Sequence, residues 1–599
     1  MPSGWGPLAG VCALLLLIAG IWPHRQTRLV STTQTLVDPV TARYDNFNPE
    51  DASLKLVQVV FRHGARTPLN TIYNFSDVNW THCHDHYQGV EIELYDENGG
   101  AHPPSILDPN NPELPGGCRE GTLTEAGYQM AIDVGTWLRS RYVTTGGPTG
   151  GFLPDMGPEA LQEADMDLIS ASVVDSSSSS SSGSLVAWNA AVATLRTTPI
   201  RRTVATLRGV LTGLWPRLSP PSEAARGQAA PSPVLPVGAS LESLEIMYGN
   251  NNTCPRLGPL HEAMQRDLDA ADARDSELPR LNRQVAEALG LDPEKTILWP
   301  KLYDHLAAMI ADGAPMPVGA TREVLDTIWA QAERHEAGII APSADLCASL
   351  GSGDTDSSDA RRRRCHEVLR LGIGMLVRRL LDNMEEHIAA HTRSSAAVAA
   401  AAPASQLYLF SGHDSSLMPL LAVLGQPARA WPPFASHLVF ELWQRKAAAT
   451  VPGDKKAPTA AAATMGRRGR VTAESELSGS RSGSGLGSGN HDTEFWVRVL
   501  YNGAPLVVPG LSNAAGWAPM GLLHQRVLLP YAISPAEHTT VCSRLDISDL
   551  DAVRAPSRST LTGDIWGGSD GDGNGGGDDS ISRKAGAAAR TRLLRHATL

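Results

Sequence analysis

The chain has 599 residues, of which 42% are hydrophobic, 19% charged and only 5% aromatic. Its 51 Lys and Arg residues against 63 Asp and Glu give a formal net charge of −12. No overall basic field is therefore available to attract nucleic acid, and any anion-binding site has to be local. The 56 glycines and 42 prolines indicate a folded body interrupted by loops and low-complexity sequence.

Residues 1–45 are predicted to be a targeting or anchoring segment and a linker. The run Leu8–Trp22 is apolar and uncharged, Arg25 and Arg28 follow it, and no acidic residue precedes Asp38. Its length of about 15 residues is below the roughly 20 that span a bilayer, which favours a signal peptide or a short signal-anchor. We therefore expect a secretory or membrane-anchored protein that can associate with membranes through this segment. No Lys or Arg precedes the apolar run, although secretory signals usually have a basic start. The acid-free leader with Arg25 and Arg28 also resembles a mitochondrial presequence, which is the alternative.

A folded domain is expected over residues 46–545, with an α/β core at about 54–215 and 364–545. The Val-rich run Leu54–Phe61 predicts a buried strand that leads directly into the sequence RHGARTP. Leu123–Tyr142 predicts a helix with Thr124 as its N-cap and with Met130, Val134 and Leu138 on one face. A serine run at 176–182 is expected to be a flexible insertion, and strand, loop and helix follow it over LVAWNAAVATLRTTPIRRTVATLRGVLTGLW.

The middle of the chain has mostly helical patterns. Residues at about 241–345 predict a helical cap inserted into the α/β unit, 351–359 a loop, and 361–391 a long helix. The four arginines Arg361–Arg364 favour a solvated helix start over a phosphate or nucleic-acid site.

The last third of the domain returns to strands. QLYLF predicts a second buried strand, and SGHDSSLMPLLAVLG a turn that enters a helix. The segments 438–443 and 494–501 are expected to pair as a hairpin around an insertion at about 447–490, which is predicted to be disordered. The GSGLGSG sequence in this insertion has no strand before it and no helix after it, so it is not a nucleotide-binding loop. No fold is expected for the low-complexity tail at 546–599.

The seven cysteines contain no CxxC pair or zinc-type cluster. One of them, Cys12, lies in the apolar leader. The other six could form disulfides in an oxidising compartment or remain free thiols: Cys83, Cys118, Cys254, Cys347, Cys365 and Cys542. Asn-x-Ser/Thr sequons at Asn74, Asn79 and Asn251 are compatible with a secretory route.

The sequence RHGARTP has the residues that a phosphate site needs, at the place where α/β sheets bind ligands. Arg62 and Arg66 each offer a planar, permanently charged fork for phosphate oxygens, and the imidazole of His63 between them can attack phosphorus. Neighbouring positive charge disfavours imidazolium, which would keep His63 neutral and nucleophilic. Gly64 leaves room for the phosphate to approach the backbone.

A third arginine is expected, because the phosphoryl group in transfer carries charge on three equatorial oxygens. Arg196 follows a strand-like run and is favoured for this role. Arg201 and Arg202 are the competitors, but both would lie on the next helix and could form its solvated face.

A carboxylic acid that stays protonated at mildly acidic pH could protonate the leaving oxygen. Three His-Asp dipeptides are present, at 84–85, 413–414 and 491–492. Only His413-Asp414 follows a buried strand and opens a helix, where a helix N-terminus can also face a phosphate. Asp414 is therefore the predicted acid.

No metal and no other cofactor are predicted. The sequence THCHDHY, with His82, Cys83, His84, Asp85 and His86, is the alternative metal site. Metal ligands usually converge from several directions, and one stretch of five residues supplies too few of them.

The motifs VVFRHGARTP, LRTTPIRRT and FSGHDSSLMPLLAVLG resemble those of the histidine acid phosphatases, branch 2 of the histidine phosphatase superfamily. The resemblance covers Leu54 to about Cys542, insertions excepted, and implies a phosphoglycerate-mutase-like α/β core with an inserted helical cap. It implies His63 as the phosphohistidine nucleophile and Asp414 as the proton donor. The phosphate contacts that it implies are Arg62, Arg66, Arg196 and His413.

The sequence departs from the family pattern at three positions. Gly412 stands where alanine is commoner, and Pro199 and Arg201 alter the third-arginine motif. These changes concern the local loop geometry more than the chemistry.

The resemblance implies hydrolysis of a small-molecule phosphomonoester. The segments LKLVQVVFRHGARTPL, WPPFASHLVFELWQ and FWVRVLYNG are most similar to the type 6 lysophosphatidic acid phosphatases, which raises a lysophospholipid as substrate. The alternatives are a phosphatase for a soluble sugar or inositol phosphate and a catalytically silent binding protein of the same fold.

Overall fold

A computed structural model describes residues 47–73, 75, 78–84, 87–96, 111–157, 192–220, 233–350, 355–392, 405–427, 431–446 and 495–551. The predicted targeting segment, the serine run, the insertion at 447–490 and the tail from 552 onward lie outside these residues. The described part of the chain contains no helix that is long and apolar enough to cross a membrane.

The described strands form one nine-stranded sheet in the order β2-β4-β3-β5-β1-β6-β7-β8, with β9 paired to β7. The strands from β2 to β1 in this order are parallel, and β6 to β9 pair in antiparallel fashion. The bounds are β1 (Ala52–Arg62), β2 (Glu91–Tyr95), β3 (Ala193–Thr197), β4 (Val234–Ala239), β5 (Leu407–Gly412), β6 (His437–Arg445), β7 (Phe495–Tyr501), β8 (Ala504–Pro505) and β9 (Trp517–Pro519). The α/β class is confirmed, and so is the hairpin, in which Leu438 pairs with Tyr501.

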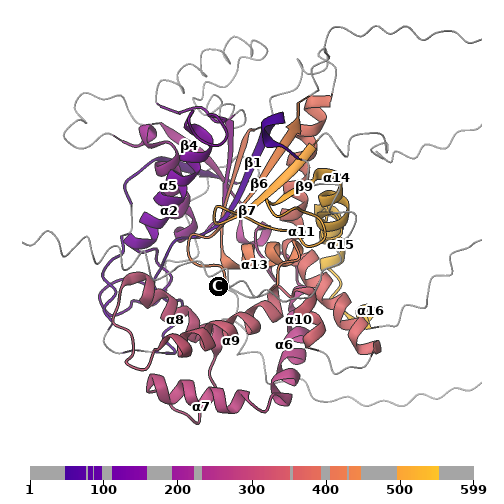
Figure 1. Cartoon of the computed structure of the whole chain (residues 1–599). Helices are drawn as coiled ribbons and strands as arrows, with labels where there is room; N and C mark the ends of the chain where they lie inside the picture. Colours follow the sequence, from indigo (N-terminus) through magenta and orange to yellow (C-terminus); the bar gives the residue numbers. More distant parts are fainter. Residues whose placement is uncertain are drawn as a thin grey trace, which may run out of the picture.

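Strand β1 is buried on both faces, as its Val-rich sequence predicts. Val57, Val59 and Phe61 belong to one core cluster, and Leu56 and Val60 to the other. The first face is covered by α2 (Glu125–Leu138), η3 (Arg139–Val143) and α5 (Arg201–Leu214), and the second by α11 (Thr355–Thr392), α13 (Asp414–Val423) and α14 (Met520–Leu523) (Figure 1). The sheet is therefore a layer between two groups of helices.

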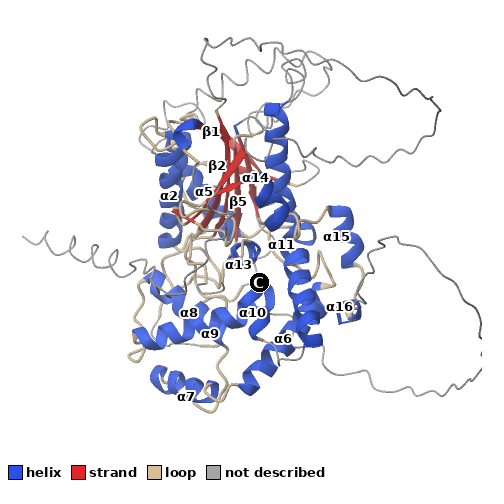
Figure 2. Ribbon diagram, turned by 45° about the vertical axis from the view of Figure 1, so that its right-hand side comes forward, coloured by secondary structure: helices blue, strands red, loops and turns tan. Residues whose placement is uncertain are grey.

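The segment predicted as a cap at 241–345 is largely helical. It and the residues just beyond it contain η6 (Glu242–Leu244), α6 (Leu257–Arg274), α7 (Leu278–Leu289), α8 (Trp299–Asp312), α9 (Arg322–Ile340) and α10 (Ala344–Ser349). Figures 1 and 2 show α6 to α9 beyond the end of the sheet where α13 begins. The remaining elements are η2 (Pro49–Asp51), η4 (Pro216–Leu218), η8 (His524–Leu528), α15 (Pro535–Cys542) and α16 (Ser548–Asp551).

Helix α2 begins where it was predicted, because the Thr124 hydroxyl accepts a hydrogen bond from the amide of Gly127 at 3.2 Å. Its buried face differs from the prediction. Ala131 is buried there with Val134 and Leu138, whereas Met130 is only half-buried. The buried face contains small residues because α5 packs closely against it.

Two predictions in the middle of the chain are wrong. The loop expected at 351–359 ends early, because α11 begins at Thr355. The four arginines are not merely a solvated helix start. Arg364 forms an ion pair with Asp267 of α6 at 2.8 Å, and the buried Arg361 lies 3.6 Å from the same carboxylate.

The six body cysteines form three disulfides, which settles the alternative between bridges and free thiols. The pairs are Cys83–Cys118, Cys254–Cys542 and Cys347–Cys365. The second pair connects the start of the cap segment to α15. Helix α16 also lies within the tail that was predicted to have no fold, and it packs against α11.

Candidate active site

The two site histidines lie side by side at the ends of two neighbouring parallel strands. His63 follows the last residue of β1, and His413 follows the last residue of β5. The backbone amide of His63 donates to the carbonyl of Gly412 at 3.0 Å, and the imidazole centroids are 5.6 Å apart. The carboxyl ends of these strands therefore build the centre of the site, as expected for an α/β sheet.

The imidazole of His63 is oriented for attack through Nε2. Its Nδ1 lies 2.8 Å from the carbonyl oxygen of Gly64, which can only accept, so Nδ1 carries the proton. The side chain is 1% exposed, and burial, with the charges of Arg202, Arg66 and Arg62, holds the pKa of His63 well below its usual value. His63 is therefore neutral at mildly acidic pH, with its Nε2 lone pair unprotonated.

Arg62 lies between the two predicted catalytic groups. Its guanidinium donates to the carbonyl of Pro432 at 2.5 Å and forms an ion pair with Asp414 at 2.8 Å. It also stacks over the ring of Phe434, at 4.4 Å from the ring centroid. Contacts on several sides hold this arginine in one orientation.

Arg66 is held by a residue of the cap. Its Nη1 lies 2.8 Å from Oδ1 of Asp304 on α8 and also donates to the Thr67 carbonyl at 3.1 Å. The side chain of Arg66 is 3% exposed. The cap helix thus contacts the phosphate-site residues directly.

The neighbouring charges favour the carboxylate form of Asp414, whereas its predicted role needs the protonated form. Burial would raise its pKa, but the charges of Arg62 and Arg66 and a hydrogen bond from Trp431 outweigh burial and lower the pKa to about 2. The indole Nε1 of Trp431 donates to Oδ2 of Asp414 at 2.8 Å. Without a bound anion, the arginines therefore stabilise the carboxylate.

His413 is fixed by the ends of β3 and α13. Its Nε2 lies 2.9 Å from the hydroxyl of Thr198, and its amide donates to the Ser416 hydroxyl at 3.1 Å. A Cβ at Gly412 would lie 2.5 Å from that same hydroxyl oxygen. Glycine at this position, where the family more commonly has alanine, therefore leaves room for the Ser416 hydrogen bond.

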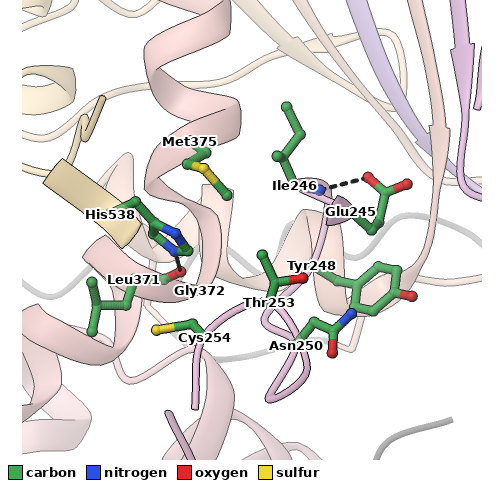
Figure 3. Close-up of a pocket in the computed structure, with 10 residues that line it drawn as sticks. All are labelled: Glu245, Ile246, Tyr248, Asn250, Thr253, Cys254, Leu371, Gly372, Met375 and His538. Carbon is green, nitrogen blue, oxygen red and sulfur yellow. Dashed lines mark hydrogen bonds between the residues drawn. The ribbon is translucent and has the colours of Figure 1, made fainter. Parts of the chain in front are cut away.

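Arg196, the predicted third arginine, contacts β4 and the segment that follows it. Its guanidinium is hydrogen-bonded to Ser240 and lies 3.4 Å from Oε1 of Glu245. Oε1 of Glu245 also accepts the backbone amide of Ile246 (Figure 3) and that of Met247. The fully buried Glu245 thus forms an ion pair with Arg196. Burial raises the pKa of Glu245, and the charge of Arg196 opposes this increase.

Arg202, unlike Arg201, is buried at the start of α5. It is 5% exposed, so the predicted solvated position on the helix is wrong for Arg202, while Arg201 is exposed. Among charged neighbours, Arg202 has the largest effect in lowering the pKa of both His63 and His413, after burial itself. The reason is that α5 begins at Arg201, next to the β3 end, and turns Arg202 inward.

Helix α5 also contacts the catalytic loop directly. The amide of Gly64 donates to the hydroxyl of Thr206 at 3.1 Å. Both α5 and α13 start at the site, so their N-terminal dipoles add positive potential to that of the arginines.

Sequence reasoning missed four residues that surround the arginines. Asp304 and the neighbouring Tyr303 come from α8, and Tyr303 stacks on Trp431 with ring centroids 4.4 Å apart. Trp431 and Phe434 belong to the sequence WPPF, which is an available signal because exposed turns rarely combine two aromatic residues. Nothing in the α8 sequence separates Asp304 from ordinary helix carboxylates.

Tyr248 connects the site to a neighbouring pocket. Its ring lies edge-on to His413, with centroids 5.4 Å apart, and it lines a pocket together with Glu245, Thr253 and His538 (Figure 3). The Glu245 carboxylate that holds Arg196 is therefore part of this adjoining wall.

The alternative metal site lacks its sulfur ligand. Cys83 is bonded to Cys118, His84 lies 2.6 Å from Glu125, and His82 lies 3.6 Å from Asp312. The remaining members, Asp85 and His86, lie outside the described residues. A second group, Cys254, His538 and Cys542, is close enough to hold an ion, but its two sulfurs are joined in a disulfide.

The sequence profile of the histidine phosphatase superfamily (branch 2) matches residues 53–307 and 358–502. Counting factor 60 of Dictyostelium discoideum is 24% identical over 403 residues, which cover 66% of this chain and 78% of that protein. Lysophosphatidic acid phosphatase type 6 of Bos taurus is 24% identical, covering 67% and 77%. Testicular acid phosphatase of Homo sapiens is 24% identical, covering 70% and 73%. The family profile covers more than half of the chain, including the strands that carry His63 and His413, and this chain belongs to the histidine phosphatase superfamily, branch 2.

Proposed function

We propose that this protein is an acid phosphatase that hydrolyses phosphate monoesters through a phosphohistidine on His63. The observation that carries the proposal is a buried, neutral imidazole with a free Nε2, set among arginines. Burial and the charges of Arg202, Arg66 and Arg62 lower the pKa of His63, so it remains a nucleophile in acidic solution.

Three guanidiniums match the three equatorial oxygens of a phosphoryl group in transfer. In this proposal Arg62, Arg66 and Arg202 hold the phosphate, and His413 contacts it. They would supply the positive charge that a metal supplies in other phosphatases. The absence of a metal or other cofactor remains a prediction.

Binding of a phosphate dianion would change the state of Asp414. The carboxylate now relies on Arg62, whose guanidinium would turn part of its hydrogen-bonding capacity to phosphate oxygens. With a second anion beside it, the pKa of Asp414 would rise from its present value of about 2. The substrate would thus help to protonate its own general acid.

The chemical steps then balance in two halves. Nε2 of His63 forms a bond to phosphorus as the P–O bond to the alcohol breaks, and the Asp414 proton moves to the leaving oxygen. Water then attacks phosphorus as the P–Nε2 bond breaks, Asp414 takes up a proton from that water, and inorganic phosphate and neutral His63 are released.

The surroundings favour a substrate with one phosphate over a polyphosphate. The cap side of the site carries the carboxylates of Asp304 and Glu336. Burial, and then the charges of Asp414 and Asp304, raises the pKa of Glu336 to about 7. Near or above pH 7, where Glu336 is ionised beside Asp304, this wall would repel the additional phosphates of an inositol polyphosphate.

We propose a lysophosphatidate as the substrate class. It has a single phosphate and an apolar chain, and the rings of Tyr303, Trp431 and Phe434 beside the arginines can pack against apolar groups. The names of the type 6 relatives support the same choice. A soluble sugar phosphate is the second candidate.

Trapping of the covalent intermediate tests the reaction. We predict that alkaline quenching with a 32P-labelled monoester leaves alkali-stable, acid-labile label on the wild type, localised to His63 by peptide mapping. His63→Ala should lose both the label and turnover. Near-normal turnover by His63→Ala would refute the covalent mechanism, and absence of turnover in the wild type would favour a binding protein of the same fold.

A substrate panel tests the class. Lysophosphatidate should give a higher kcat/KM than glucose phosphates, xylose phosphates or inositol hexakisphosphate, with p-nitrophenyl phosphate as the reference. A preference for inositol hexakisphosphate would contradict the argument from the acidic cap wall.

We also propose that the protein enters the secretory pathway or is membrane-anchored through its apolar N-terminal run. The three disulfides support an oxidising compartment. Asn79 and Asn251, two of the three sequon asparagines, are exposed, and Asn74 lies outside the described residues.

A further inference from the structure

Both carboxylate oxygens of Asp304 are engaged with the catalytic loop. Oδ1 lies 2.8 Å from Nη1 of Arg66, and Oδ2 accepts the backbone amide of Leu69 at 2.7 Å. The Asp304 side chain is 12% exposed. Asp304 comes from α8 in the cap, whereas Arg66 and Leu69 follow β1 in the core (Figure 1). One carboxylate therefore fixes the arginine and the loop that carries it.

These contacts use only one edge of the Arg66 guanidinium. Nη1 is taken by Asp304 and by the Thr67 carbonyl. Nε is buried and has no hydrogen-bond partner among the residues that the structure describes. A buried N–H without a partner is costly, and a phosphate oxygen would satisfy it. The edge formed by Nε and Nη2 is the pair of donors that grips two oxygens of one phosphate.

We propose that Asp304 is a positioning residue for phosphate binding: it holds the Nη1 edge of Arg66 so that the Nε–Nη2 edge faces the phosphate. The inference rests on the proposed function, because it assumes that Arg66 binds the phosphate of the substrate. It also makes the phosphate affinity of the core depend on the position of cap helix α8.

The sign of the effect separates positioning from simple electrostatics. Asp304 is an anion beside a site for anions, so removal of its charge alone should strengthen phosphate binding. A positioning role has the opposite consequence. Asparagine can still accept from Leu69, but it then directs its NH₂ group at Arg66, and the arginine loses its charged partner. Weaker binding by Asp304→Asn therefore requires that orientation matters more than charge.

The test compares the full-length wild type with Asp304→Asn and with Asp312→Asn as the matched control. Asp312 is a carboxylate on the same helix, but it pairs with His82 rather than with the catalytic loop. Inorganic phosphate is the probe, and its Kd is measured by calorimetry, so that the result does not depend on turnover. Steady-state kinetics with p-nitrophenyl phosphate gives KM and kcat for the same proteins.

A double-mutant cycle with Arg66→Lys shows whether Asp304 acts through Arg66. We expect Asp304→Asn to raise the phosphate Kd and the KM about tenfold, with a much smaller change in kcat. Asp312→Asn should behave as the wild type. In the Arg66→Lys background, which lacks the planar fork, Asp304→Asn should have almost no further effect.

Other results would overturn the inference. They are an unchanged or lower phosphate Kd in Asp304→Asn, an equal loss in Asp312→Asn, and a full additional loss in the Arg66→Lys background. If the wild type binds phosphate but hydrolyses no ester, the proposed function fails and the Kd comparison still decides the role of Asp304. If the wild type binds no phosphate, both fail.

Discussion

Arg196 and Arg202 show how different two arginines of one short segment can be. Arg202 has the larger influence on the site histidines, whereas Arg196 neutralises the fully buried Glu245. The position of Arg202 suits catalysis, and the position of Arg196 suits stability.

This difference predicts opposite effects of two alanine substitutions. Arg202→Ala should lower kcat/KM about 100- to 1000-fold, the usual loss when one preorganised donor to a developing charge is removed, with little change in stability. Arg196→Ala should leave kcat/KM within a few-fold but lower the free energy of unfolding by about 3 kcal/mol, because Glu245 loses its partner in a buried position. Kinetics with p-nitrophenyl phosphate and urea denaturation measure the two effects. The reverse pattern would restore Arg196 as the third phosphate arginine.

A second prediction at this scale concerns the proton. Asp414→Asn should reduce hydrolysis of lysophosphatidate, whose alkoxide leaves poorly, far more than that of p-nitrophenyl phosphate, because asparagine cannot act as an acid. His413→Ala removes a contact common to both substrates and should reduce both by similar factors. Rates across a series of leaving-group pKa values measure the difference. Equal losses for Asp414→Asn along the series would move the role to another acid, for which Glu336 of α9, whose pKa is raised by burial and by Asp414, is a candidate.

At the scale of elements, helix α2 and the catalytic loop touch through two glycines. A Cβ on Gly127 would lie 1.9 Å from the carbonyl oxygen of Ala65, and one on Gly64 would lie 2.0 Å from the carbonyl oxygen of Gly127. Gly64 is thus needed for helix packing, in addition to the access for phosphate that the sequence suggested. The start of α2 therefore sets the position of the loop between His63 and Arg66.

This contact predicts a loss of both stability and activity in Gly127→Ala. Alanine is the better helix former, but the helix would have to move away from the loop, at a cost of about 3 kcal/mol. The displaced loop should lower kcat/KM as well. Gly146→Ala is the control, since a Cβ there meets no atom within 4 Å, and it should change the free energy of unfolding by less than about 0.5 kcal/mol. Unchanged unfolding of Gly127→Ala in urea would contradict this packing.

At the scale of the whole molecule, buried histidines should make the free energy of unfolding decrease in acid. The ring of His437 is buried on β6, opposite Phe61, and burial lowers its pKa to about 4. The folded pKa lies below the unfolded value of 6.5, so the unfolded chain takes up the proton first as the pH falls. The stability contributed by neutral His437 is therefore present above pH 6.5 and is lost between pH 6.5 and about 4.

We expect this residue alone to account for about 3 kcal/mol of the decrease in unfolding free energy between pH 7 and pH 4. His437→Phe removes the titration and keeps an aromatic ring against Trp137, whose centroid lies 4.8 Å away. The variant should therefore lose about 3 kcal/mol less than the wild type over this pH range. Urea denaturation at both pH values measures the difference, and identical pH slopes would show that His437 protonates equally easily in both states.

The sequence by itself determined the parts of this protein that depend on local order along the chain. The buried strand before RHGARTP, the strand before His413-Asp414, the hairpin pairing of Leu438 with Tyr501 and the family could all be predicted. These features rest on short motifs and on runs of apolar residues, and both are contiguous. The helical content of the cap segment followed in the same way from its apolar spacing.

Only the tertiary structure decided which charged groups meet. Arg196 lies on a strand and Arg202 on a helix. The sequence around Arg196 does not indicate that Ser240 and Glu245, in the segment after β4, will contact it. The ionised state of Asp414 also depends on Arg62, and the hold of Asp304 on Arg66 depends on how the cap packs on the core. Ion pairs between residues of different elements arise from packing, and periodicity contains no information about them.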